Sequence, residues 1–247
     1  MPPSPYSPHP SNSMNPQPFT DLQVITFDGD GTLWDFHSAM RLALEACLAH
    51  LEARIPGITE NWTVETLIEI RDQVARAFQD RAPSLIEIRY HSFLEALRQM
   101  GVQDPEPLAR EITDLYLTLK DHHLKVFPEV PKALELLHSR FRLGLLSNGN
   151  TDPRRLGLAH WFDFTLFAEH IGIQKPDPAF YHLAIRTAGV PASQILHIGD
   201  SIDNDVLPAQ EIGMQTLWLN RERLPNPDPS KIQEISSLME VLDYVAI

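Results

Sequence analysis

The stretch from Val24 to Trp34 reads Val-Ile-Thr-Phe-Asp-Gly-Asp-Gly-Thr-Leu-Trp, and it decides the fold. Its first four residues are apolar or β-branched and predict a buried strand. Asp28 and Asp30 follow at once, and the glycine after each allows an unusual backbone path. In open α/β sheets, ligands bind at this carboxyl end of the strands. Two carboxylates there repel each other unless a cation relieves them, and their hard oxygen ligands favour Mg²⁺.

An Asp-Gly pattern taken alone is equally typical of a turn. The residues at the ends of later strands decide between a turn and a ligand site. Ser147 and Asn148 follow the next apolar run of the sheet. Lys175 lies in the loop after another expected strand, and Asp200 follows a later apolar run. Each would pass for a turn or surface residue by itself. Four strand ends in this order are difficult to produce by chance and predict one polar site at one sheet edge.

The rest of the chain divides into a helical part and an alternating part. Helical periodicity is expected over residues 38–54, 63–81, 84–99 and 106–122. Beyond these, strands are expected at 142–147, 164–167, 195–198 and 216–219, and helices at 131–139, 179–188, 203–212 and 232–242. Alternation of this kind predicts an α/β fold with a Rossmann-like, doubly wound parallel sheet.

The spacing of the elements predicts the domains. The interval between the first two sheet strands far exceeds the ~30 residues of a βαβ unit, so its helices are expected to form an inserted all-helical cap. We expect the core over residues 20–35 and 127–247, and the cap over 36–126. Residues 1–19 are rich in proline and serine and are expected to be disordered.

Composition excludes several classes of function. A chain of 247 residues with 43% hydrophobic content can bury one core and a smaller domain. The net charge of −13 argues against nucleic acid and anionic membranes as partners. No apolar run approaches the roughly 18 residues of a membrane span. The single cysteine and the lack of a signal-peptide pattern predict a cytoplasmic protein. A monomer and a homodimer are both consistent with the sequence.

Together these segments resemble the motifs of the haloacid dehalogenase superfamily, in the branch with a helical cap inserted after the first motif. The resemblance runs in order over residues 22–220, and the cap agrees in length and helical character only. The matching segments are Asp28–Thr32, Ser147, Lys175–Pro176, and Gly199–Ser201 followed by Asp205.

The resemblance implies a reaction for the two aspartates of the first motif. Asp28 would attack phosphorus and form an aspartyl-phosphate, which divides one difficult displacement into two. Asp30 would protonate the leaving oxygen and then activate water. Mg²⁺ would be held by Asp28, by the backbone carbonyl of Asp30 and by Asp200.

The resemblance also implies roles for the other motif residues. Ser147 and the Asn148 amide would hold the phosphoryl oxygens, and Lys175 would offset negative charge there. Thr32 would orient Asp30 within this phosphate site. Asp205 would support the metal from outside its direct ligands.

Asp30 also discriminates among the activities of the family. Dehalogenases lack an acid at this position, because a halide leaves without a proton. The resemblance therefore implies Mg²⁺-dependent hydrolysis of a small phosphorylated metabolite. A sugar-phosphate phosphomutase, a 2-haloacid dehalogenase and a catalytically silent binding protein remain alternatives.

Residues outside the motifs receive a weaker interpretation. Arg89, His91 and Lys125 lie in or near the expected cap; contact with substrate is one interpretation, and an ordinary surface position is the expected one for each. Trp34 is expected either to border the pocket or to pack in the core.

Overall fold

The computed structural model describes residues 18–78 and 84–245. The expected disordered tail lies almost wholly outside these residues, as does the expected end of the second cap helix. Six parallel strands form one sheet in the order β3-β2-β1-β4-β5-β6. The strands are β1 (Val24–Phe27), β2 (Arg142–Ser147), β3 (Phe164–Phe167), β4 (Ile195–Gly199), β5 (Gln215–Leu219) and β6 (Glu234–Ile235).

The strand order places a switch point at β1. β2 and β3 lie on one side of β1, whereas β4 to β6 lie on the other. Later strands are therefore added on opposite sides of β1. The loops that follow the central strands diverge and leave a crevice between them. Phe27, the last residue of β1, is in register with Leu145 of β2 and Ile198 of β4, so these strands end at one edge.

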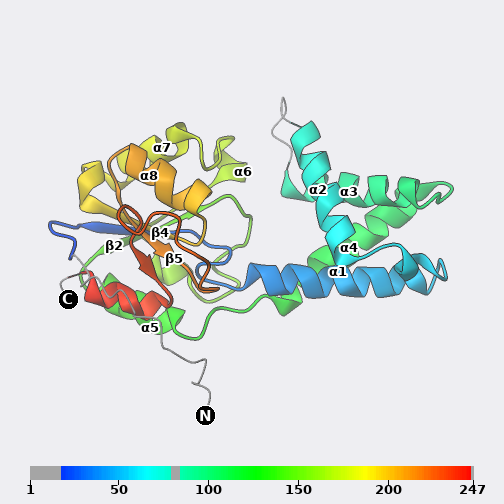
Figure 1. Ribbon diagram of the computed structural model, residues 1–247, viewed down its shortest axis with the longest axis horizontal. Coiled ribbons are helices and arrows are strands. Elements are labelled where there is room, and N and C mark those ends of the chain that lie inside the picture. The colour runs from blue at the N-terminus through cyan, green and yellow to red at the C-terminus, as the bar shows by residue number, and fades with distance from the viewer. Residues whose placement is uncertain (1–17, 79–83, 246–247) are drawn as a thin grey trace, which may run out of the picture.

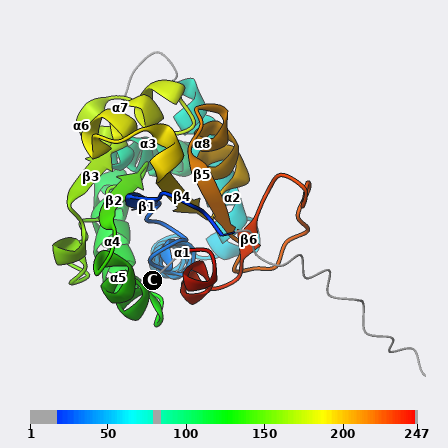
Figure 2. The same cartoon turned by 90° about the vertical axis from the view of Figure 1, so that its left-hand side faces the viewer.

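Helices cover both faces of the sheet. Ile25 and Phe27 pack against α5 (Val130–His138) and the C-terminal 3-10 helix Leu238–Asp243. Val24 lies in the cluster on the opposite face, beneath α7 (Pro178–Ala188) and α8 (Leu207–Glu211). Figure 2 shows these two layers on either side of the strands. Burial on both faces explains why every residue of β1 is apolar or β-branched, and the expected fold class is confirmed.

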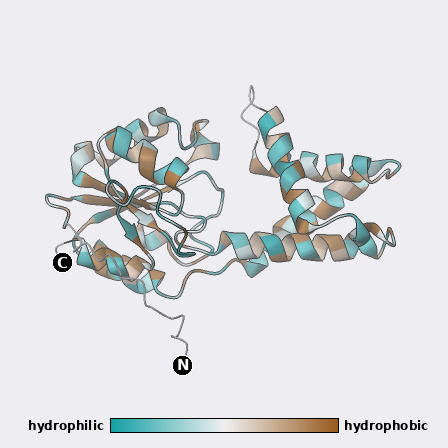
Figure 3. Cartoon of the chain, viewed as in Figure 1, coloured by the Kyte–Doolittle hydropathy of each residue, from teal (hydrophilic) through white to brown (hydrophobic). Residues whose placement is uncertain are grey.

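Four long helices form a second hydrophobic cluster beyond the sheet (Figure 1). They are α1 (Phe36–Glu52), α2 (Val64–Ala77), α3 (Leu85–Gln99) and α4 (Pro105–His123). Their sequences carry clear start signals, since Asp35, Thr63 and Ser84 each accept a backbone hydrogen bond at a helix N-terminus. Figure 3 shows that hydrophobic and hydrophilic residues are interspersed along these helices. Residues 18–78 and 84–245 contain no helix that is both long and apolar enough to cross a membrane.

Two linkers, residues 33–35 and 125–127, join the four-helix part to the sheet. They pair side by side through two backbone hydrogen bonds of 2.9 and 3.2 Å. Between these bonds, Trp34 and Val126 form an antiparallel bridge. Both connections between the two hydrophobic clusters therefore pass through one short ribbon.

The C-terminal region differs from the sequence prediction. The helix expected over 232–242 is wrong, because β6 pairs with the edge of β5 and only a 3-10 helix follows. A two-residue strand is too short to show a period, and Ser237 separates it from the helix by accepting a hydrogen bond from Met239 N. The helix expected over 203–212 is present, but it begins with a π-helical turn, Ile202–Val206.

Candidate active site

Asp28 occupies the carboxyl end of β1, at the switch point. Its backbone N–H donates to Ile198 O over 2.9 Å, which continues the ladder to β4 and fixes the direction of the carboxylate. The side chain is buried, and burial raises the pKa of Asp28 well above its ordinary value. Lys175 opposes this shift from close range, because a neighbouring cation favours the charged form.

Lys175 bridges two carboxylates. Its Nζ donates to Asp28 Oδ1 over 2.6 Å and to Asp205 Oδ1 over 2.5 Å, and its side chain is 2% exposed. Burial opposes the charge on Lys175, but Asp205 and Asp28 together raise its pKa above the ordinary value. Burial likewise acts against an ionised Asp205, yet the Lys175 ammonium holds the pKa of that carboxyl well below its usual range. Lys175, Asp28 and Asp205 therefore form a buried hydrogen-bonded network in which Lys175 and Asp205 are charged.

Asn148 holds the loop that carries Lys175. The side-chain amide donates to Lys175 O and accepts from Lys175 N, both over 2.8 Å. This paired contact fixes the loop onto the end of β2. Ser147 is fully buried, and its hydroxyl accepts from Gly149 N over 2.9 Å. The structure therefore brings Ser147 and Lys175, which belong to two of the matching segments, close together. The Asn148 side chain holds the Lys175 loop in place.

Asp30 has its own hydrogen-bond donors. The Trp34 indole donates to Asp30 Oδ1 over 2.5 Å, and Thr151 Oγ1 lies 3.5 Å from the same oxygen. Burial raises the pKa of Asp30, although the Trp34 hydrogen bond acts in the opposite direction. Thr32 Oγ1, which was expected to orient Asp30, is buried without a hydrogen-bond partner among the described residues. In this structure Trp34 makes the orienting contact instead.

Three carboxylates lie close enough to share a cation. One oxygen from each of Asp28, Asp200 and Asp205 falls within 4.8 Å of the others. Burial, together with the charge of Asp205, raises the pKa of Asp200 to about 6. Clustered carboxylate oxygen atoms are hard ligands and a donor set that suits Mg²⁺. Asp205 already receives hydrogen bonds from Lys175 and Ser201 N, which leaves Asp28 and Asp200 as the freer pair.

His197 extends the buried network behind the site, and the sequence analysis did not identify it. It lies within β4, with Nε2 3.3 Å from Asp205 Oδ1 and Nδ1 2.9 Å from Thr26 Oγ1. Burial lowers the pKa of His197, so the ring is neutral near pH 7. A polar pair at matching positions of two apolar strands, Thr26 and His197, is the signal that would have shown it.

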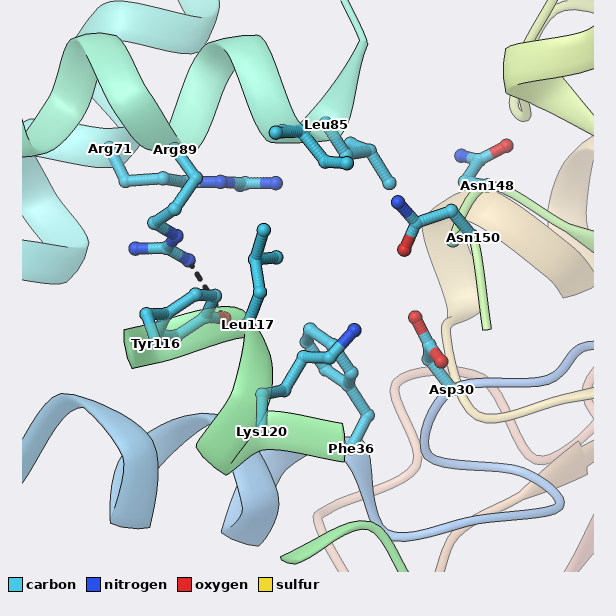
Figure 4. A pocket seen from close by; sticks show the side chains of 12 residues that line it. Asp30, Phe36, Arg71, Leu85, Arg89, Tyr116, Leu117, Lys120, Asn148 and Asn150 are labelled. Carbon is cyan, nitrogen blue, oxygen red and sulfur yellow. Dashed lines mark hydrogen bonds between the residues drawn. The ribbon is translucent and has the colours of Figure 1, made fainter. Parts of the chain in front are cut away.

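A cavity of about 180 Å³ opens between the four-helix part and the sheet (Figure 4). Asp30, Asn148 and Asn150 line it from the sheet side. The opposite wall includes Arg89, which is buried, so the expectation of an ordinary surface position is wrong for this residue. Sequence periodicity did not reveal this position, because an arginine on the inner face of a cap helix has no local signature.

Comparisons with known proteins agree with this geometry. Glyceraldehyde 3-phosphate phosphatase of Methanopyrus kandleri is 29% identical over 91% of this chain and 97% of its own length. The 5-amino-6-(5-phospho-D-ribitylamino)uracil phosphatase of Escherichia coli is 26% identical, over 90% and 98% of the two chains.

A solved structure extends the comparison to another activity in the same fold. The 2-haloacid dehalogenase of Pseudomonas syringae pv. Tomato is 35% identical, with a TM-score of 0.71, over 89% of this chain and 96% of that one. The profile of the haloacid dehalogenase-like hydrolases matches residues 22–213, which is most of the chain. The resemblance read from the motifs is thus confirmed, and the protein belongs to the haloacid dehalogenase-like hydrolases.

Proposed function

We propose that this protein is a Mg²⁺-dependent phosphatase of small phosphomonoesters, with residues 36–126 as a cap over the site. The observation that carries the proposal is Asp30, an acid whose buried carboxyl favours the protonated form, two residues beyond Asp28. An alkoxide leaving group requires a proton, whereas a halide does not. The phosphatase relatives support the same class of reaction.

The first step forms a bond between Asp28 and phosphorus. A carboxylate oxygen of Asp28 attacks phosphorus while the bond from phosphorus to the ester oxygen breaks. The Lys175 ammonium, 2.6 Å from Asp28 Oδ1, favours the carboxylate form that attacks and so acts against the effect of burial. Asp30 transfers its proton to the departing oxygen, so that the alcohol leaves neutral.

The second step returns Asp28 to its starting state. Asp30, now a carboxylate, takes a proton from water, and the water oxygen attacks phosphorus. The bond between phosphorus and Asp28 breaks, and inorganic phosphate leaves. Each proton that Asp30 gives in the first step is recovered in the second, so the enzyme is unchanged after one cycle.

Asp28, Asp200 and the Asp30 carbonyl would hold Mg²⁺. When bound, the ion would supply positive charge that offsets the phosphoryl oxygens and separates the carboxylates. We assign Asp205 to the support of Lys175, because its oxygens are engaged by Lys175 and Ser201 N. Ser147 and the backbone amide of Asn148 would hold phosphoryl oxygens, and Thr32 would belong to the phosphate site.

Phosphate release tests the proposal directly. The wild-type protein is incubated with a panel of small phosphomonoesters in Mg²⁺ and in EDTA, beside Asp28→Asn. We expect release that requires Mg²⁺ and falls at least 10³-fold in Asp28→Asn, because the variant lacks the nucleophile. Unchanged release from Asp28→Asn, or none from any ester with Mg²⁺ bound, would contradict the phosphatase assignment.

A dehalogenase is the second candidate, and the similarity to the Pseudomonas syringae protein favours it. The same Asp28 would then attack carbon and displace halide. Chloride release from 2-chloropropionate separates the two activities. We expect none above background, and release faster than that of phosphate would favour the dehalogenase.

A further inference from the structure

Three cationic side chains face the site from the cap. Arg71 of α2, Arg89 of α3 and Lys120 of α4 line the cavity opposite Asp30 (Figure 4). Asp30 is the only carboxylate among the described residues that line it. The whole chain carries a net charge of −13, so this grouping of cations is a local departure from its general character.

Arg89 is buried and has no anionic partner among the residues that the structure describes. Its side chain belongs to a residue that is 6% exposed, and none of the described carboxylates lies within ion-pair distance. The guanidinium instead donates to Tyr116 Oη over 3.2 Å and stacks 4.3 Å from the centre of that ring. Burial lowers the pKa of Arg89, and the nearby charge of Arg71 adds to the effect. A buried charge without an opposite charge is costly, so this position favours an anion brought by a ligand.

Each of the other two cations pairs with the aspartate that follows it in the chain. Arg71 meets Asp72, its neighbour in the chain, over 2.9 Å, and both side chains are exposed to solvent. Lys120 meets Asp121 over 3.0 Å, and Asp121 also pairs with Arg155. Lys120 and Asp30 line the same cavity, so the cationic wall faces the reacting groups.

We propose that Arg89 and Arg71 bind a second anionic group of the substrate, a carboxylate or a second phosphate, at the end away from the reacting phosphoryl group. This inference rests on the proposed phosphatase function and names the class of substrate. The cavity of about 180 Å³ suits a short carbon chain between the two anionic ends. Leu85 and Leu117 supply an apolar surface for that chain.

Matched esters test the inference on the wild-type protein. We would compare 3-phosphoglycerate, propane-1,3-diol bisphosphate, glycerol 3-phosphate and phosphoethanolamine, which differ in the charge at the second end. We expect kcat/KM to be at least tenfold higher for one or both anionic esters than for glycerol 3-phosphate, mainly through KM. Phosphoethanolamine should be the poorest substrate. Comparison of the first two esters identifies whether carboxylate or phosphate is preferred.

Two variants assign the preference to the cap arginines. Arg71 is half-exposed, so Arg71→Glu is expected to fold. It should abolish the preference for an anionic end and improve phosphoethanolamine by tenfold or more. Arg89→Met keeps much of the side-chain volume and should also abolish the preference, with circular dichroism to verify folding. Arg98→Gln, a matched control at an exposed cap arginine paired with Glu106, should retain the wild-type preference.

The outcomes separate this inference from the proposed function. Absence of phosphate release from every ester would overturn the phosphatase assignment itself. Release from all four esters at similar kcat/KM would overturn only the second-anion site. A preference that persists in folded Arg71→Glu and Arg89→Met would also overturn it, by assigning the selection to other residues.

Discussion

The hydrogen bond from the Trp34 indole to Asp30 is the contact on which we expect proton transfer to depend. It fixes one carboxyl oxygen and leaves the other toward the cavity. Trp34→Phe removes this donor and also replaces a fully buried indole with a smaller ring, so circular dichroism is needed to verify folding. A hydrogen bond to a charged group contributes about 1.5–3 kcal/mol, so we expect kcat for an alkyl phosphate to fall roughly 10-fold to 100-fold.

Leaving-group dependence tests this assignment. With p-nitrophenyl phosphate, whose leaving group departs without a proton, Trp34→Phe should lose less than threefold. Asp30→Asn should show the same contrast more strongly, with a loss of about 10² to 10⁴ for the alkyl ester. Equal losses for both esters in Trp34→Phe would show that the indole supports the site in some other way.

The motif residues were predictable because each follows a strand that can be recognised locally. Asp28, Lys175 and Asp200 needed only the strand order to be brought to one edge. Trp34 and Arg89 were not assigned roles in advance, because their functions depend on side-chain packing across the chain. His197 was missed for the same reason, since a histidine in an apolar strand has no meaning until Asp205 is placed beside it.

At the scale of elements, two glycines in and after β2 are required for different reasons. One leaves space for a residue of the site, and the other leaves space for a residue of the sheet. A Cβ at Gly149, in the loop after β2, would overlap the Asp30 carboxyl. A Cβ at Gly144, within β2, would overlap the Phe164 ring of the neighbouring strand. Neither glycine has a positive φ, so the substitution to alanine is limited by space alone.

We therefore expect opposite effects from the two alanine variants. Gly149→Ala should displace Asp30 and lower kcat tenfold or more, with Tm within about 2 °C of the wild type. Gly144→Ala should cost roughly 1–3 kcal/mol of stability through overpacking while the folded protein keeps its kcat. Urea unfolding and steady-state kinetics on both proteins measure the contrast, and equal loss of activity in folded Gly144→Ala would contradict it.

Helices and strands with several turns or pairs were predicted well, and short elements were not. The strands at 142–147 and 164–167 have the bounds expected from the sequence. β6 was missed because two residues carry no periodic signal, and its strand character comes from pairing with β5. The π-helical turn at Ile202–Val206 likewise depends on tertiary contacts, since Asp205 turns inward to meet Lys175.

At the scale of the whole molecule, the reactivity of the Cys47 thiol measures how well the four-helix part is packed. The thiol lies in the hydrophobic cluster of α1 to α4, and burial raises its pKa to about 12. The thiolate is the reactive form, so at pH 8 the folded protein should react with a disulfide reagent at least 100-fold more slowly than the urea-unfolded protein. Rapid labelling of the native protein would contradict the packing of this cluster.

Labelling in increasing urea then compares the two hydrophobic clusters. The four helices pack mainly on one another, so they can lose structure while the sheet remains. We expect Cys47 to become reactive at or below the urea concentration at which phosphatase activity disappears. Exposure of the thiol only after complete loss of the sheet would show that the clusters unfold as one unit.

The paired linkers have a mechanical consequence. Two chain segments joined side by side resist bending within their own plane and yield more easily across it, in the manner of a strap. We therefore expect the four helices to rotate over the sheet about one axis. A single linker would allow rotation about several axes. Trp34 lies on that axis and also donates to Asp30. We therefore expect rotation of the four-helix part to move Trp34 and, through it, the Asp30 carboxyl, which would couple substrate entry to proton transfer.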